Sequence, residues 1–275
     1  MFLPFFAQVV GGNSVTATTK AIIDRIQADG SGYAMTALQK RQLDTKVKGV
    51  IAQIGSLPQF WYDFNFSMNL GSAGATKVFN LGTSGATGDG TLVNGTQSTV
   101  IVNNAQSRKS ARFTGTTNSD NVRITTSQPT LVNDQTFFAK FRINSTSVIH
   151  SLFGANTANN SAFYIASGTP RIRFDKAGAF NIGNGTATTL ATATDYSIAL
   201  TNSNAKAYVG YVNGAVEAMS APGGNPHAQT FVTNSLSIGT SFSGADRLMA
   251  DVEGLMIFNT VLTAPQIAYL NTLYT

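Results

Sequence analysis

Short β-strand patterns dominate the chain from Ser110 to the C-terminus. In residues 136–143 every second position is apolar, and these positions are Phe137, Ala139, Phe141 and Ile143. Comparable runs recur at intervals of roughly 10 to 20 residues and are separated by turn-forming residues. This succession is typical of an antiparallel β-sandwich or jelly roll, so we expect a mainly β fold.

Three local signals refine this expectation. The apolar run 209–212 is followed by Asn213-Gly214, a strong signal for a two-residue hairpin turn. Residues 250–258 are apolar on both strand faces in their second half, which predicts a central strand covered on both sides. Thr263 and Gln266 form a capping-box pattern, which predicts a last short helix.

Residues 14–54 have helical periodicity instead. Thr36 and Gln39 form another capping-box pattern. The helix that follows carries one apolar stripe, at Leu43, Val47, Val50, Ile51 and Ile54. Because two short helices cannot bury much against each other, we expect this stripe to pack on the sandwich or on another subunit.

The N-terminus is an apolar arm that contains Phe2, Leu3, Phe5 and Phe6. The arm lacks the basic start of a signal peptide, Pro4 interrupts it, and it is far too short to span a bilayer. We expect it either to pack onto its own domain or to insert into a partner protein.

These patterns divide the chain into residues 1–55, an arm with helices, and residues 56–275, the sandwich. The sandwich starts near Gln59, because the aromatic cluster 59–66 has the alternation of an early strand. We assign attachment or oligomerisation to the first part, through its apolar residues Phe2, Leu3, Phe5, Phe6, Leu43, Val47, Val50 and Ile54.

Composition excludes several function classes. Charged residues make up only 11% of the chain, the net charge is +5, and cysteine is absent. Basic residues form no run beyond pairs such as Lys40-Arg41, whereas binding to phosphates needs clustered cations, so nucleic-acid binding is disfavoured. Without cysteine there is no disulfide, no cysteine–zinc site and no thiol nucleophile.

Several motifs occur in the order seen in laminin-G-like, concanavalin-type domains. Residues 208–214 resemble the "Y-V-N-G" hairpin of that family, and residues 260–267 resemble its closing "L-[ST]-x-x-[EQ]-I" segment. Further segments that resemble its strands are residues 111–115, 121–124, 137–141, 236–239 and 250–258. The resemblance implies a concanavalin-like jelly roll, a fold that serves lectins, adhesion modules and glucanases alike.

Glycoside hydrolysis needs a pair of carboxylates. The chain has only two glutamates, Glu217 and Glu253, and Asp251 with Glu253 has the spacing of a pair on one strand face. The glucanases of the resembled fold carry a third acid, and position 256 is Met instead. We therefore predict that the chain is not an enzyme.

Metal binding has little support in the sequence. His150 and His227 stand alone, without the spacing of metal ligands, so no metal site or cofactor is predicted. Asp120, Asn121 and Asp246 are the candidate ligands if calcium binds at a rim of the sandwich, although an oxygen-rich loop with one Asp is more often a turn.

Glycan binding is the function that the sandwich pattern leaves open. It needs an aromatic ring to stack on a sugar face and polar side chains around that ring. The candidates on predicted strands are Tyr164, Arg171, Arg173, Tyr208 and Tyr211. The alternative is that these aromatic rings pack in the core and the arginines are solvated.

Residues 33–66 and the segment Lys77–Leu81 resemble a module of bacteriophage virion proteins. In that module a helix of "L-x-x-x-Q-x-x-x-L" type leads into an aromatic segment and a short "N-L" strand. The resemblance implies a structural virion protein at the particle surface, a homo-oligomer with other virion proteins as partners, and cell-surface glycan as a further partner. The alternative is a secreted, extracellular carbohydrate-binding module of a bacterium, and a polysaccharide hydrolase is the third hypothesis.

Overall fold

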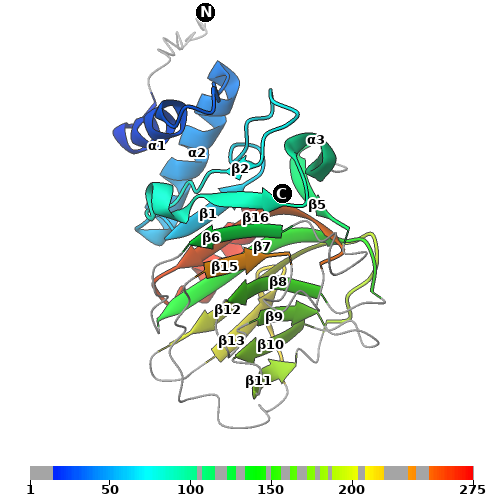
Figure 1. The fold of residues 1–275 in the computed structure, drawn as a ribbon. Coiled ribbons are helices and arrows are strands. Elements are labelled where there is room, and N and C mark those ends of the chain that lie inside the picture. Colours follow the sequence, from blue (N-terminus) through cyan, green and yellow to red (C-terminus); the bar gives the residue numbers. More distant parts are fainter. Residues whose placement is uncertain are drawn as a thin grey trace, which may run out of the picture.

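The computed structural model describes residues 15–103, 107–114, 123–127, 134–146, 150–155, 162–165, 172–176, 180–184, 188–203, 208–219, 235–239 and 248–274. Among these residues two eight-stranded antiparallel sheets pack face to face. Figure 1 shows the second sheet in front of the first, with helices α1 and α2 at the upper end. The expected mainly β sandwich is therefore confirmed.

The first sheet, sheet A, has the order β14-β13-β12-β7-β16-β5-β4, and β1 also pairs with β16. Its strands are β1 (Phe60–Asp63), β4 (Ile101–Asn103), β5 (Lys109–Phe113), β7 (Gln135–Ile143), β12 (Asp195–Asn202), β13 (Tyr208–Val212), β14 (Ala215–Glu217) and β16 (Ala250–Phe258). All nine residues of β16 are buried, which confirms the predicted central strand. One side of β16 pairs with β7 along most of its length, and the other side is shared between β5 and β1.

The second sheet, sheet B, has the order β11-β10-β9-β8-β15-β6-β3-β2. Its strands are β2 (Lys77–Val78), β3 (Gly90–Val93), β6 (Arg123–Ser127), β8 (His150–Ala155), β9 (Ala162–Ile165), β10 (Ile172–Lys176), β11 (Phe180–Asn184) and β15 (Ser235–Ile238). The helices are α1 (Ala17–Ala28), α2 (Ala37–Ile54), α3 (Gln97–Val100) and α4 (Ala264–Thr272), with a 3₁₀ turn at Gly85–Gly88.

Two hydrophobic clusters lie on opposite faces of sheet A. The first fills the space between the sheets and contains Phe137, Ala139, Phe141 and Ile143 of β7, the alternation expected from the sequence. The second lies between sheet A and the helices. Its members include Ile23 and Ile26 of α1, Leu43, Val47 and Val50 of α2, Ile267 and Leu270 of α4, and Trp61, Phe138, Met256 and Phe258 of sheet A. The helices therefore share one core with the outer face of sheet A.

This second cluster identifies what covers the apolar stripe of α2. Leu43, Val47 and Val50 are fully buried against the chain's own sandwich. Ile54 packs against the same cluster while partly exposed. Our expectation that Leu43, Val47 and Val50 attach to another subunit is wrong, because their side chains offer no surface to a partner. For Ile54 it stays a prediction. Phe2, Leu3, Phe5 and Phe6 lie outside the described residues, so attachment through the arm stays a prediction.

The local signals that set the helix and turn positions are confirmed. Both capping boxes form, at Thr36 with Gln39 and at Thr263 with Gln266. Asn213 and Gly214 have positive φ angles of 50° and 81°, as the tight turn between β13 and β14 requires.

A β-bulge interrupts β16 where it pairs with β7. Val252 lies opposite Phe141 and Gly254 lies opposite Lys140, so Glu253 is the inserted residue. Ala250 and Val252 face the inter-sheet core before the bulge, and Leu255 and Ile257 do so after it. The bulge thus shifts the core-facing positions of β16 from even to odd residue numbers. It also directs Glu253 toward Arg108.

Candidate ligand-binding pocket

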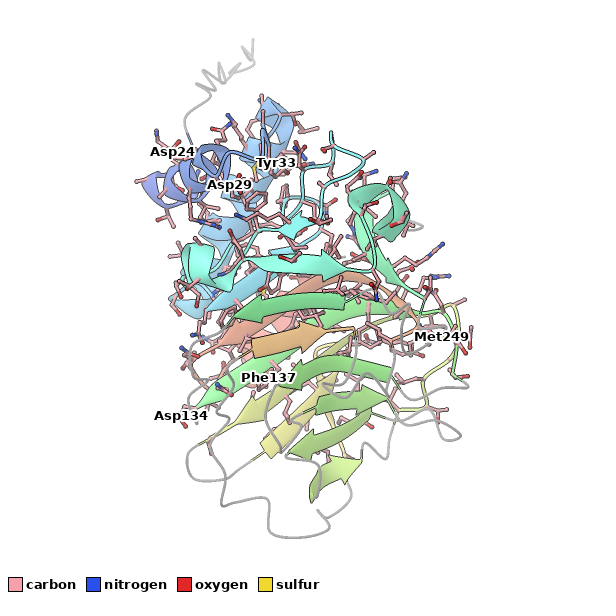
Figure 2. The ribbon with its side chains drawn as sticks, viewed as in Figure 1. Asp24, Asp29, Tyr33, Asp134, Phe137 and Met249 are labelled. Carbon is pink, nitrogen blue, oxygen red and sulfur yellow. The ribbon has the colours of Figure 1, made fainter. Side chains whose placement is uncertain are left out.

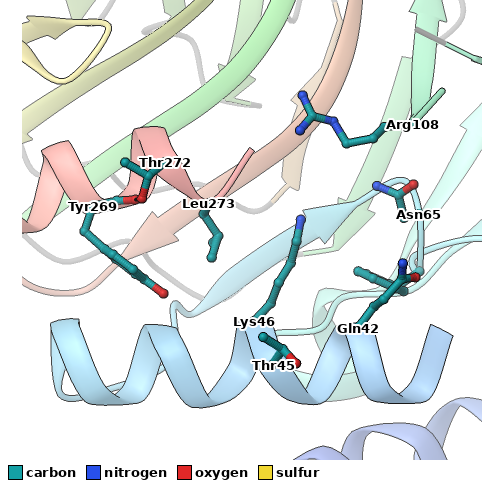
Figure 3. Close-up of a pocket in the computed structure, with 9 residues that line it drawn as sticks. Gln42, Thr45, Lys46, Asn65, Arg108, Tyr269, Thr272 and Leu273 are labelled. Atoms are coloured by element: carbon teal, nitrogen blue, oxygen red, sulfur yellow. Dashed lines mark hydrogen bonds between the residues drawn. The ribbon is translucent and has the colours of Figure 1, made fainter. Parts of the chain in front are cut away.

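A pocket of about 480 Å³ lies where α2, the turn after β1 and α4 meet. Its lining residues are Gln42, Thr45 and Lys46 of α2, Asn65 and Phe66 of the turn, Arg108 before β5, and Tyr269, Thr272 and Leu273 at the end of the chain. In Figure 3, Lys46 rises from α2 and Arg108 reaches in from the strand side, so their charged ends lie toward the middle of the pocket.

Lys46 is held in place by an ion pair at the pocket wall. Its Nζ donates to Oδ2 of Asp63 over 2.7 Å and lies 4.2 Å from the centre of the Tyr274 ring. Asp63 is fully buried at the end of β1, and its other oxygen accepts hydrogen bonds from the backbone and side-chain amides of Asn65. The ammonium group is therefore fixed by a carboxylate on one side and an aromatic face on another.

Arg108 is anchored in the same way by the bulge residue of β16. Its Nη2 lies 3.0 Å from Oε2 of Glu253, and the Glu253 side chain is only 4% exposed. Lys140 of β7 is buried nearby. Burial lowers the pKa of Lys140, whereas the charge of Glu253 raises it. Three cations and two carboxylates thus gather beneath and beside the pocket.

Two aromatic rings complete the wall. Phe66 is buried, and Tyr269 is partly exposed on α4. Tyr269 approaches α2 at Gly49, where a Cβ atom would lie 2.1 Å from the tyrosine hydroxyl. Burial raises the pKa of Tyr269. The pocket therefore combines ring surfaces with amide, hydroxyl and cationic donors.

The acid pair considered for hydrolysis is not open to solvent. Asp251 is 3% exposed, and its carboxylate accepts two hydrogen bonds of 2.7 Å from Arg112 and one of 2.9 Å from Asn144. Glu253 is 3% exposed and paired with Arg108. Both carboxylates are engaged by arginines and closed off from a substrate.

The candidate sugar-binding residues predicted from the sequence do not lie together on one sheet. Tyr164 of β9 and Arg173 of β10 are directly opposite in register on sheet B, and their role in sugar binding stays a prediction. Tyr208 lies on β13 of sheet A, opposite Asn202. Tyr211 is 5% exposed and belongs to the cluster under the helices, so its ring is a core residue, and our expectation for it is wrong. Arg171 lies outside the described residues.

The candidate calcium ligands Asp120, Asn121 and Asp246 also lie outside the described residues. Within the part of the chain that the structure describes, no three His, Cys, Asp or Glu side chains form a group suited to a metal ion. Over the same residues, no helix has the length and apolar character needed to cross a bilayer.

The pocket around Lys46 and Arg108 is a feature that the sequence did not reveal. The only local signal for the pocket is a set of polar residues on one face of the helix, beside the apolar stripe. These residues, spaced i, i+3 and i+4, are Gln42, Thr45 and Lys46. Its other residues come from chain positions as distant as 65 and 273, and the fold alone brings them together.

Comparison with solved structures supports the fold. Domain 4 of an extracellular GH43 arabinanase from Geobacillus stearothermophilus, solved with arabinotriose, has a TM-score of 0.56 at 14% identity, over 78% of this chain and 98% of that domain. A Trypanosoma rangeli sialidase in complex with 2,3-difluorosialic acid has a TM-score of 0.52 at 14% identity. It is matched over 86% of this chain and 39% of the sialidase chain.

The receptor-binding domain of botulinum neurotoxin type G has a TM-score of 0.50 at 12% identity, over 79% of this chain and 51% of that chain. No curated protein matches the sequence. The laminin-G-like model described as the concanavalin A-like lectin/glucanases superfamily matches residues 114–268, more than half of the chain. The chain therefore belongs to the concanavalin A-like lectin/glucanases superfamily.

Proposed function

We propose that this chain is a glycan-binding protein without hydrolase activity. The observation that carries the proposal is the pocket between α2, the turn after β1 and α4. At about 480 Å³ it falls within the size range of small-molecule sites, roughly 300–1,000 Å³. Its amide and hydroxyl groups suit sugar hydroxyls, and the Tyr269 ring offers an apolar surface to a sugar face.

Two further observations support a binding role. The arabinanase domain that shares the fold was solved with arabinotriose, which is a property of that protein and a precedent for this one. The buried, arginine-paired state of Asp251 and Glu253 leaves no open acid pair among the described residues of sheet A.

A glycan array and calorimetric titration of the full chain test the proposal. We expect Tyr269→Ala to weaken glycan binding about 5- to 30-fold, the effect of losing roughly 1–2 kcal/mol of ring contact. Leu38→Ala is the control, because Leu38 is 56% exposed on α2 and does not line the pocket. Folding of both variants is checked by thermal melting. If no glycan binds at all, the proposal is wrong.

A second binding position is favoured by the register of sheet B, where Tyr164 and Arg173 are opposite each other. Binding at this position predicts that Tyr164→Ala weakens glycan binding while Tyr269→Ala does not. The two variants therefore distinguish the sheet from the pocket.

The absence of hydrolysis is tested by incubating the chain with the polysaccharides that it binds. We expect no release of reducing ends. Release that disappears in Asp251→Asn or Glu253→Gln would contradict the assignment, provided that the variants melt like the wild type.

The bacteriophage virion role is a finer proposal, which rests on the resemblance of residues 33–66 to a virion module. In this role the sandwich is displayed on the particle, and the arm with Phe2, Leu3, Phe5 and Phe6 attaches it. Mass spectrometry of purified particles tests the location. Absence of the chain from the particles favours the secreted carbohydrate-binding module instead.

A further inference from the structure

All of the charged residues that line the pocket are positively charged. Lys46 and Arg108 are cations, and none of the other lining residues is a carboxylate. Their acidic partners, Asp63 and Glu253, have side chains that are 0% and 4% exposed, whereas Lys46 is 18% and Arg108 is 23% exposed. A ligand entering the pocket therefore meets the cations and not the carboxylates.

The buried carboxylates fix the positions of the two cations. Asp63 binds Nζ of Lys46, and Glu253 lies against Nη2 of Arg108. Both cationic side chains are therefore held in place, and Figure 3 shows both of them directed into the pocket. Pre-positioned donors lower the entropic cost of binding an anion.

The surrounding charges also leave a positive excess. Lys140 lies close enough to Glu253 and Arg108 for their charges to act on it. The cluster then holds three cations (Lys46, Arg108, Lys140) and two carboxylates (Asp63, Glu253). The neighbouring pair of Arg142 and Asp195 adds one charge of each sign, so the excess of one positive charge is unchanged.

We infer that the glycan bound in this pocket carries a carboxylate group, as in an acidic pyranose, which Lys46 and Arg108 bind. The inference rests on the proposed function and adds the class of sugar. The ring of Tyr269 lies at the same pocket and contacts the sugar ring, while the two cations contact its acidic substituent.

Calorimetric titration of the full chain with matched ligands tests the inference. One pair is an oligogalacturonate and the same oligosaccharide with its carboxylates reduced. The other pair is sialyllactose and lactose, which distinguishes a sialate from a uronate as the source of the carboxylate. We expect at least one acidic ligand to bind about tenfold or more tightly than its neutral partner, the usual effect of a charge-assisted hydrogen bond.

Variants of the two cations provide the second test. We expect Lys46→Gln and Arg108→Gln each to weaken binding of the acidic ligand about tenfold more than they weaken binding of the neutral partner. Lys20→Gln, which removes an exposed cation on α1, is the control and keeps full affinity. Because each single variant leaves a buried carboxylate alone, the double variants Lys46→Gln/Asp63→Asn and Arg108→Gln/Glu253→Gln are measured beside them.

Equal affinity for acidic and neutral ligands overturns the inference and leaves the proposed function standing. Acidic selectivity that survives in both double variants also overturns the inference, because the carboxylate is then recognised elsewhere. Absence of binding to every sugar overturns the proposed function itself. The comparison of matched ligands needs no variant, so poor folding of a variant does not prevent the test.

Discussion

The buried carboxylate of Asp63 holds the turn after β1 against α2. Asp63 is fully buried and accepts hydrogen bonds from Lys46 and from Asn65, so Asp63→Asn weakens several contacts at once. We expect the substitution to lower the free energy of unfolding by about 2–3 kcal/mol. Asp24→Asn removes an exposed ion pair with Lys20. We expect this substitution to lower the free energy of unfolding by less than about 0.5 kcal/mol. Urea unfolding measures both, and equal effects would contradict this account.

Two glycines make room for tyrosines in different ways. At Gly254 a Cβ atom would lie 2.3–2.5 Å from the hydroxyl oxygen and two ring atoms of Tyr274, and Tyr274 is fully buried. At Gly49 the nearest contact is the far end of the partly exposed Tyr269. We expect Gly254→Ala to destabilise the chain by about 1–3 kcal/mol. For Gly49→Ala we expect a change within about 1 kcal/mol, because the higher helix propensity of Ala offsets the displaced ring.

Thermal melting measures this difference. If Gly254→Ala is tolerated as well as Gly49→Ala, the packing of Tyr274 against β16 is not as tight as described. The displaced Tyr269 ring should at the same time weaken glycan binding in Gly49→Ala, because Tyr269 lines the pocket.

At the scale of elements, Leu43, Val47 and Val50 of the α2 stripe belong to the core and not to an interface. Leu43 is fully buried, so Leu43→Ala should lower the free energy of unfolding by about 2–5 kcal/mol. The same variant should keep the oligomeric state of the wild type, as measured by light scattering. A change of oligomeric state with unchanged stability would support the attachment role that the structure contradicts.

Asp44 links α1 to α2 and makes this contact sensitive to acid. Its carboxylate accepts hydrogen bonds from the backbone amide and hydroxyl of Thr16 and from the hydroxyl of Thr19, and it pairs with Lys48 over 2.6 Å. Burial alone would raise the pKa of Asp44, but these hydrogen bonds outweigh burial and lower it well below 3.8.

Because the folded-state pKa of Asp44 is depressed, its stabilising effect is present above the unfolded-state pKa. The effect is lost as the pH falls from about 4 toward the folded-state pKa. We expect wild type to exceed Asp44→Asn in free energy of unfolding at neutral pH, and the difference to narrow below about pH 4. Urea unfolding at several pH values measures this, and a difference independent of pH would contradict it.

Elements with local signals were predictable from the sequence. The capping boxes at Thr36 and Thr263 and the turn at Asn213-Gly214 depend on neighbouring residues, so their chemistry is visible in a short window. The division of one side of β16 between β5 and β1 is not visible there, because pairing is decided between distant segments. The pocket was missed for the same reason, since Lys46 and Arg108 meet only after the sheet and helices have packed.

For the whole molecule, the shared core means that the helices belong to the folded unit. Removing residues 1–55 would expose apolar residues on the outer face of sheet A, among them Trp61, Phe138, Met256 and Phe258. We expect this truncated chain to lose cooperative unfolding and to aggregate. Removing residues 1–14 leaves every described residue of both clusters in place, and we expect this shorter truncation to fold.

Circular dichroism and size-exclusion chromatography compare the two truncations. A folded, soluble sandwich without residues 1–55 would contradict the shared core and restore the boundary expected from the sequence. Loss of particle binding in the shorter truncation, with stability intact, would support attachment through the arm.

The position of β16 also determines when the protein can fold during its synthesis. This strand occupies the centre of sheet A, between β7 on one side and β5 and β1 on the other, yet it is the last strand of the chain. Tyr274 follows β16, and its hydroxyl accepts a hydrogen bond from the indole N–H of Trp61 in the same cluster. In a nascent chain β1, β5 and β7 therefore lack their common neighbour until residues 250–258 have been synthesised. Premature termination anywhere before Ala250 leaves a polypeptide with an open sheet, which makes it a substrate for chaperones and proteases.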